Sequence, residues 1–269
     1  MMGFYEFFNL LKAPGTMNYD RAKPYNEKAR GIPLPRKGSC SHCNLCTTVC
    51  PTKSIVSMSS EELSIDYGSC LQCGLCVDVC GENYLSNSGF LYAFSHHREE
   101  LKLKFTLGTF TPKKYDVPEN VLNFQKLTNK NGFNYREVAA SGNNSVECEL
   151  SASFNYVFDS EGEQVKSVAS PKHADAIVYS GPIGENMEKP LNTAFECMPS
   201  PKALIAMGTE AISGGVFQKG KPPITPDLYV AGDPPRPDVA IQSFRFLMGK
   251  FKFSFQNALF DFMFGKKND

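Results

Sequence analysis

The chain has 269 residues, which is enough for one large or two modest domains with cores of their own. Lys plus Arg and Asp plus Glu both number 28, so the formal net charge is zero and no nucleic-acid partner is indicated. Eight of the ten cysteines fall within residues 40–80, and no secretory signal is recognisable. We therefore expect the protein to reside in the reducing cytoplasm and not to be a secreted disulfide scaffold. The sequence contains no run of about 18 apolar residues, so it predicts no transmembrane helix.

Residues 1–38 are expected to form an N-terminal amphipathic helix followed by an extended arm. Within residues 1–12, four apolar side chains recur at helical spacing, with polar residues on the other side. They are Phe4, Phe7, Phe8 and Leu11. Pro14 and Gly15 end the pattern, and the remainder of the segment is rich in proline, glycine and charge.

Residues 39–88 contain two copies of the motif C-x-x-C-x-x-C-x-x-x-C. The first copy consists of Cys40, Cys43, Cys46 and Cys50, and the second of Cys70, Cys73, Cys76 and Cys80. Three thiolates spaced in this way on one tight loop can each bind one iron of a [4Fe–4S] cubane, while the fourth reaches the other cubane. Between the motifs, the alternating residues 55–66 suit two short strands.

This exchange of the fourth cysteine predicts two ligand sets. Cluster 1 would take Cys40, Cys43, Cys46 and Cys80, and cluster 2 would take Cys50, Cys70, Cys73 and Cys76. A zinc site usually needs two separated pairs of ligands, and a disulfide knot needs no such repeat, so two full copies of the motif favour clusters. Such clusters carry single electrons, and no nearby residue suggests bond-making chemistry.

Residues 89–125 look like a mixed linker, in which the pair His96 and His97 is expected to be solvated surface. From residue 126 to residue 269 the chain looks α/β. Apolar runs at residues 176–179, 203–207 and 227–230 are each followed by a glycine-containing turn. They predict parallel strands.

A crossover helix is expected at residues 185–198, between the first two of these strands. Sites in parallel sheets lie at the carboxyl ends of the strands, which directs attention to the loops after Tyr179, Met207 and Val230. The apolar segment 238–264 predicts a helix that is buried or docked, although alternation in residues 251–255 leaves a strand open.

The N-terminal third resembles a known family. Arg30-Gly31-Ile32-Pro33, about ten residues before the double cysteine motif, is similar to the two-cluster ferredoxin-like subunit of respiratory complex I and of membrane-bound group 4 [NiFe] hydrogenases. In that family an N-terminal amphipathic helix rests on the membrane surface, and the resemblance implies this role for residues 1–11.

The second half resembles a different subunit of the same complexes. The matching segments are residues 171–182, 198–202, 206–217 and 229–238. They are similar to the small subunit of group 4 hydrogenases, equivalent to the complex I subunit that holds the last cluster before quinone. The expected fold class is therefore α/β plus α+β: a two-cluster ferredoxin-like domain followed by a flavodoxin-like parallel-sheet α/β domain.

This chain departs from the small-subunit pattern where that family binds its proximal cluster. The family uses two cysteines of a C-x-x-C-x-x-E motif and one cysteine in each of two later turns. The corresponding residues here are Ser141, Asn144, Glu210 and Asp233, with Glu147 as the glutamate of the motif. A register shifted onto Glu149 gives Asn143 and Val146 and supplies no thiolate either. The resemblance thus implies a vacated cluster position.

Cys148 and Cys197 are too few to rebuild that position, because oxygen ligands suit iron–sulfur clusters poorly. We expect both to be ordinary buried thiols. A hard metal on Glu210 and Asp233 has no further support in the sequence.

Together, the residues and the resemblances predict an iron–sulfur electron-transfer subunit of a membrane-associated oxidoreductase. The complex would be of the NADH-quinone oxidoreductase or [NiFe] hydrogenase type, and this subunit would have no catalytic site of its own. Its expected cofactors are two [4Fe–4S] clusters. The second domain would mainly dock the large subunit. Membrane subunits, a soluble electron carrier and the cytoplasmic face of the cell membrane are the other expected contacts.

Two other hypotheses remain open from the sequence. The chain could be a non-redox assembly or adaptor protein whose clusters are mainly structural, since cluster binding also contributes to folding. It could also be a free-standing enzyme that uses Glu147, Glu210 and Asp233 as acid–base groups on a small molecule.

Overall fold

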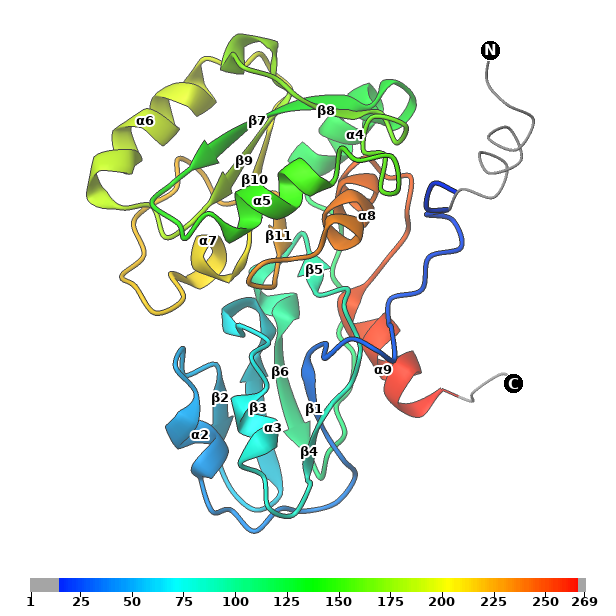
Figure 1. Cartoon of the computed structure of the whole chain (residues 1–269), viewed down its shortest axis with the longest axis vertical. Coiled ribbons are helices and arrows are strands. Elements are labelled where there is room, and N and C mark those ends of the chain that lie inside the picture. Colours follow the sequence, from blue (N-terminus) through cyan, green and yellow to red (C-terminus); the bar gives the residue numbers. More distant parts are fainter. Residues whose placement is uncertain (1–14, 266–269) are drawn as a thin grey trace, which may run out of the picture.

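The computed structural model describes residues 15–265, so the helix expected in residues 1–12 lies outside the described residues. Figure 1 shows two regions stacked along the long axis, with the cysteine-rich region below and a larger α/β region above. Among residues 15–265, no helix has the length and apolar character that a membrane crossing requires.

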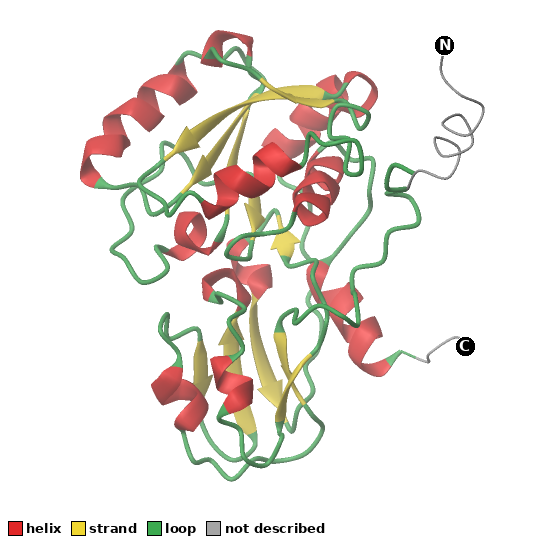
Figure 2. Cartoon of the chain, viewed as in Figure 1, coloured by secondary structure: helices red, strands yellow, loops and turns green. Residues whose placement is uncertain are grey.

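A six-stranded sheet forms the centre of the α/β region (Figure 2). Its strands are β5 (Phe94–Ser95), β7 (Phe133–Ala139), β8 (Val165–Ser167), β9 (Ala176–Ser180), β10 (Ala203–Met207) and β11 (Leu228–Val230). They lie in the order β5-β11-β10-β9-β7-β8, and all pairs are parallel except β5 with β11. The five parallel strands have the flavodoxin-like order 2-1-3-4-5, which confirms the predicted fold class.

Five helices accompany this sheet. They are α4 (Glu119–Asn131), α5 (Ser145–Ala152), α6 (Glu185–Glu196), α7 (Thr209–Ser213) and α8 (Pro237–Leu247). Helices α5 and α8 lie side by side against the sheet, and α6 is the expected crossover between β9 and β10 (Figure 1). All residues of β9, β10 and β11 are buried, as expected for central parallel strands covered on both faces.

The cysteine-rich region contains two small antiparallel sheets. One consists of β2 (Ile55–Ser57), β3 (Glu62–Asp66) and β6 (Lys102–Thr106), and the other of β1 (Pro33–Pro35) and β4 (Leu85–Asn87). Short helices α2 (Leu45–Val49), α3 (Leu75–Asp78) and η1 (Tyr67–Ser69) connect them. Strands β2 and β3 confirm the two short strands expected within residues 55–66.

Residues 89–125 are more than the expected linker, because they add a strand to each half of the molecule. Strand β5 pairs with β11 of the α/β sheet, and β6 pairs along its whole length with β3. The short helix η2 (Arg98–Leu101) lies between them. In β6 the buried side chains of Leu103 and Phe105 alternate with exposed residues, a period-2 signal within a segment whose lysines suggested a solvated linker.

The expected solvation of His96 is wrong. Its ring is buried, stacks on Phe246 with centroids 4.1 Å apart, and places Nδ1 2.7 Å from the carbonyl oxygen of Asp227. Burial lowers the pKa of His96 to about 4, so the ring is neutral near pH 7. His97 is half-buried, with Nε2 2.6 Å from the carbonyl oxygen of Asp116.

The C-terminal segment forms two helices instead of one, and they serve different halves. Helix α8 ends beside Gly249, whose φ of +74° is left-handed, and α9 (Phe255–Phe264) continues onto the cysteine-rich region. The ring of Phe255 lies 5.6 Å from that of Tyr67 and 6.3 Å from that of Phe90. Apolar contact with the other half therefore fixes the last helix.

The N-terminal arm crosses in the opposite direction. The Met17 amide donates to the carbonyl of Val157 at 2.7 Å, and the Gln242 amide donates to the carbonyl of Tyr19 at 3.1 Å. The arm thus packs on the α/β region, while α9 packs on the cysteine-rich region. The arm and α9 therefore interlock the two halves.

Candidate functional site

The cysteine-rich region contains two cavities that are each lined by four cysteines. Both motifs contribute cysteines to each cavity. Cavity 1 is lined by Cys40, Cys43, Cys46 and Cys80. Cavity 2 is lined by Cys50, Cys70, Cys73 and Cys76. In each case three thiols come from one loop and the fourth comes from the end of the other motif. The structure therefore gathers the eight candidate ligands into the two groups that the spacing predicts.

The loops around the two cavities repeat one backbone conformation. His42 and Gln72 occupy equivalent positions with a left-handed φ of +55°, and the next left-handed residues are Asn44 and Gly74. The amides of His42 and Gln72 each donate to the sulfur two residues earlier, at 3.4 Å in both loops. Left-handed residues are costly unless they serve the turn, so their repetition shows that both loops are shaped around their cavities.

The fourth cysteines also accept hydrogen bonds from the backbone. The Ser54 amide donates to Cys50 Sγ at 3.2 Å, and the Leu85 amide donates to Cys80 Sγ at 3.4 Å. Burial alone would raise the pKa of the Cys50 thiol, but hydrogen bonds with Ser54 and Thr52 outweigh it and lower that pKa. Such donors stabilise negative charge on sulfur, which is the state that binds iron.

The two cavities differ in burial. Cys43 is exposed in cavity 1, whereas Cys70 and Cys76 are only 7% and 9% exposed in cavity 2. Burial raises the pKa of the Cys70 thiol to about 11 and that of the Cys76 thiol to about 12. These thiols are protonated near neutral pH until a metal displaces the proton.

The donor set of each cavity fits a cubane better than a single metal ion. Within residues 15–265, no three His, Cys, Asp or Glu side chains converge closely enough to hold one ion. In a [4Fe–4S] cubane each thiolate binds a different iron, so the sulfurs surround a volume and do not meet at one point. Four soft sulfur donors around a cavity are the ligands that such clusters use.

The segment Arg30 to Pro33 lies beside cavity 2, and Pro33 lines it. Arg30 Nη1 donates to the carbonyl of Cys73, and Pro33 lines the cavity while its carbonyl accepts from Tyr67 Oη at 3.0 Å. At Gly31, φ is +65° and a Cβ atom would lie 2.5 Å from the backbone nitrogen of Phe90. Arg30, Gly31 and Pro33 of this motif therefore have positioning roles beside a candidate ligand loop.

The four residues expected at vacated cluster positions, Ser141, Asn144, Glu210 and Asp233, do not converge as one set. Glu210 and Asp233 come together at the carboxyl ends of β10 and β11, but the residues between them are Asn143 and Ser145. Asn143 Nδ2 lies 3.3 Å from Glu210 Oε1 and 3.4 Å from Asp233 Oδ1, and Ser145 Oγ lies 3.3 Å from Asp233 Oδ1. We call Asn143, Ser145, Glu210 and Asp233 the carboxylate site.

The contacts of Ser141 and Asn144 are with other residues. An added Cβ at Gly184 would lie 2.5 Å from Ser141 Oγ, so Ser141 packs on the turn after β9. Asn144 places Nδ2 3.9 Å from Cys148 Sγ. The shifted register of the sequence did include Asn143, but nothing in the sequence marked Ser145.

Hydrogen bonds within the carboxylate site satisfy its own polar groups. The backbone amide of Asn143 donates to Glu210 Oε2 at 3.2 Å, and Ser145 donates to Asn143 Oδ1 at 2.6 Å. Burial, followed by the nearby charges of Asp233 and Glu147, raises the pKa of Glu210. Glu147 is itself hydrogen-bonded to Ser180. Oxygen and amide groups bonded to one another in this way do not make a site for a soft iron–sulfur cluster.

The expectation that Cys148 and Cys197 are buried is wrong, since both thiols are exposed. Cys148 lies on α5, while Cys197 caps the end of α6 that leads to the amino end of β10. Cys197 is therefore at the opposite edge of the sheet from the carboxylate site and cannot contribute to it.

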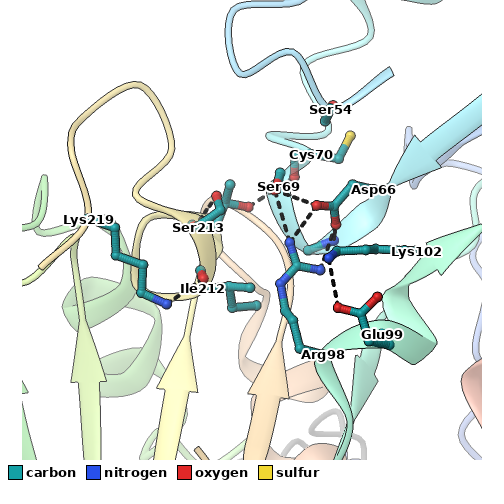
Figure 3. Close-up of polar contacts among 12 residues, drawn as sticks. Ser54, Asp66, Ser69, Cys70, Arg98, Glu99, Lys102, Ile212, Ser213 and Lys219 are labelled. Atoms are coloured by element: carbon teal, nitrogen blue, oxygen red, sulfur yellow. Dashed lines mark hydrogen bonds and ion pairs between the residues drawn. The ribbon is translucent and has the colours of Figure 1, made fainter. Parts of the chain in front are cut away.

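Cavity 2 is the one that faces the α/β region. Thr209, at the first position of α7, donates from Oγ1 to the carbonyl of Cys70 at 3.0 Å. Glu210 is the next residue. One hydrogen bond and one peptide bond therefore connect Cys70, a candidate cluster ligand, to the carboxylate site. Figure 3 shows the loop that ends at Cys70 lying against α7.

Comparisons with known proteins support both regions. Residues 143–247 match the family model described as "NADH ubiquinone oxidoreductase, 20 Kd subunit", and residues 34–81 match the "4Fe-4S dicluster domain". The chain is 33% identical over 131 residues to "Formate hydrogenlyase subunit 7" of Escherichia coli (strain K12), covering 46% of this chain and 51% of the relative.

Two further relatives match shorter stretches of the chain. Identity to the B subunit of NADH-quinone oxidoreductase from Geotalea daltonii is 40% over 100 residues, covering 34% of this chain and 59% of the relative. Identity to the B subunit of F(420)H(2) dehydrogenase from Methanosarcina mazei is 39% over 90 residues, covering 31% and 49%. The chain spans about half the length of the curated relatives it matches. These findings confirm the resemblance expected from the sequence motifs and support an iron–sulfur cofactor.

Proposed function

We propose that the chain is an iron–sulfur electron-transfer subunit of a membrane-associated oxidoreductase related to complex I and to group 4 [NiFe] hydrogenases. It would hold two [4Fe–4S] clusters, one in each cavity. The observation that carries this proposal is the repeated loop, which surrounds each of two cavities with four cysteines drawn from both motifs. When bound, such clusters accept and release one electron at a time.

The chain's own residues would hold the clusters and adjust their environment. Cys40, Cys43, Cys46 and Cys80 would bind cluster 1, and Cys50, Cys70, Cys73 and Cys76 would bind cluster 2. Backbone amides directed at sulfur favour added negative charge, and burial limits contact with water. Cluster 1, beside the exposed Cys43, is placed to exchange electrons with a soluble carrier. Cluster 2, against α7, is placed to pass them on to a partner subunit.

The α/β region would dock the large subunit without a cluster of its own. The hydrogen bonds of Asn143 and Ser145 with Glu210 and Asp233 support the absence of a cluster there, since these carboxylates already have partners. Two of the relatives' names describe subunits of formate hydrogenlyase and of NADH-quinone oxidoreductase, which supports partner subunits here. We propose that these partners include a large subunit and membrane subunits. We place the chain at the cytoplasmic face of the cell membrane, peripherally attached.

A reversible redox titration of the purified chain, followed by low-temperature EPR, separates this proposal from an assembly or adaptor protein with structural clusters. Two cluster signals that appear on reduction and disappear on reoxidation are the expected result. Clusters that stay in one redox state across the accessible range, or that break down on reduction, would favour the adaptor and contradict electron transfer.

A further inference from the structure

Arg98 binds the loop that carries one ligand of cavity 2. From η2, its guanidinium donates from Nη1 to Asp66 Oδ1 at 2.7 Å and from Nη2 to Asp66 Oδ2 at 2.5 Å. Nη2 also lies 3.1 Å from Ser69 Oγ, and Ser69 directly precedes Cys70. Figure 3 shows these contacts converging on the turn before Cys70. A bidentate pair of this kind fixes orientation as well as charge.

The guanidinium is packed between this loop and the α/β region. Gly68 leaves the room, because an added Cβ there would lie 2.7 Å from Arg98 Nη1 and 3.1 Å from Ile212 Cγ2. The side chain of Arg98 is 19% exposed and that of Asp66 is 25% exposed, so water screens the pair only partly. Together with the hydrogen bond from Thr209 to Cys70, these contacts hold the loop from the side of α7.

A second cation, Lys219, lies near Arg98. Lys219 Nζ donates to the carbonyl of Ile212 at 2.6 Å, and burial, followed by the charge of Arg98, lowers its pKa to about 8. Arg30 contacts the carbonyl of Cys73 on the other part of the ligand loop. Cations near an iron–sulfur cluster stabilise its more negative reduced form and so raise its midpoint potential.

We infer that Arg98 is a positioning residue for cluster 2: it fixes the loop before Cys70 against α7 and raises the midpoint potential of that cluster relative to cluster 1. This inference rests on the proposed function. Because Arg98 lies in η2, between the strand that joins the α/β sheet and the strand that joins the cysteine-rich sheet, it couples the potential of cluster 2 to the packing of the two halves.

The test uses the full chain with both clusters loaded and three variants. Arg98→Met removes the charge and the fork, whereas Arg98→Lys keeps the charge and loses the bidentate geometry. Lys104→Met is the matched control, because Lys104 on β6 pairs with Glu62 at 2.8 Å but is 53% exposed. Iron per chain and the midpoint potentials of both clusters are measured by EPR-monitored titration.

We expect Arg98→Met to lower the midpoint potential of cluster 2 and leave that of cluster 1 unchanged, since the carboxylate of Asp66 is left uncompensated. Arg98→Lys should fall between Arg98→Met and the wild type, and Lys104→Met should match the wild type. Loss of cluster 2 alone in either Arg98 variant also supports the positioning role.

Unchanged potentials in a fully loaded Arg98→Met protein would overturn the inference. So would equal shifts in both clusters, an equal effect of Lys104→Met on cluster 2, or loss of both clusters in both Arg98 variants. A wild-type chain that shows no reversible redox change would instead contradict the proposed function, and it is measured first.

Discussion

Cavity 2 and the carboxylate site lie on opposite sides of one hydrogen bond, from Thr209 to Cys70, yet they differ in what their side chains bond to. Around cavity 2, the backbone hydrogen bonds to the sulfur atoms of Cys50 and Cys70 come from each sulfur's own loop. In the carboxylate site, Asn143 and Ser145 bond to the two acids across the site. Cysteine sulfurs around an open cavity can bind a cofactor without losing contacts with one another. The side chains of the carboxylate site would have to give up their mutual hydrogen bonds to bind one.

The largest effect should come from removing a buried thiol of cavity 2. Cys76→Ser replaces a ligand that is 9% exposed, and we expect iron to fall from about eight to about four per chain as cluster 2 is lost. Iron analysis and EPR provide the measurement. Cys148→Ser, at an exposed thiol on α5, is the control and should change neither. Equal losses of iron in Cys76→Ser and Cys148→Ser would contradict the distinction between cavity 2 and the α/β region.

The second prediction concerns the interlocking of the halves. Phe255 is fully buried and its ring packs on Tyr67 and Phe90, so Phe255→Ala should cost about 3–5 kcal/mol of unfolding free energy. Phe217→Ala, at a side chain 58% exposed, should stay within about 0.5 kcal/mol of the wild type.

Denaturant unfolding, followed both by cluster absorbance and by circular dichroism, measures this difference. In Phe255→Ala the cluster signal should disappear at lower denaturant than in the wild type. A cluster transition that stays in place would show that α9 does not support the cysteine-rich region.

The smallest predicted effect is a pH dependence at the carboxylate site. The folded state raises the pKa of Glu210, so the folded chain keeps its proton to higher pH than the unfolded chain does. Stability is therefore lost as pH rises from the ordinary glutamate pKa of 4.5 through the raised pKa. Glu210→Gln removes this loss, so its stability relative to the wild type should improve with rising pH.

Unfolding free energies of both proteins at several pH values between about 5 and 8 check the sign. Glu161→Gln, at an exposed glutamate in the turn before β8, serves as the control and should track the wild type throughout. A stability difference for Glu210→Gln that is constant across this range would show that Glu210 does not titrate in the way its surroundings imply.

Local patterns predicted much of this molecule. Cysteine spacing indicated the grouping seen around both cavities, and apolar runs indicated β9, β10 and β11 with their turns. What the sequence did not reveal depends on contacts between distant segments. His96 is buried by residues far away in the chain, so no local period marks it. The apolar pattern of residues 238–264 did indicate burial of Phe255, but it could not show that its ring packs on Tyr67 and Phe90 of the other half.

The carboxylate site shows the same limit at closer range. The resemblance placed Glu210 and Asp233 at expected cluster positions, but it could not show that Asn143 would hydrogen-bond to both of them. Ser141 and Asn144 are both left-handed, and this backbone shape directs the loop between them. A conformation of that kind is fixed by packing against the turn after β9, which sequence spacing does not encode.

The count of iron and acid-labile sulfide per purified full-length chain tests the central claim most directly. Two loaded cavities and no cluster in the carboxylate site predict about eight of each per chain. About twelve of each, with a third EPR signal on reduction, would show that the α/β region binds a cluster despite its oxygen and amide groups. About four would show that one of the two cysteine-lined cavities does not hold a cubane.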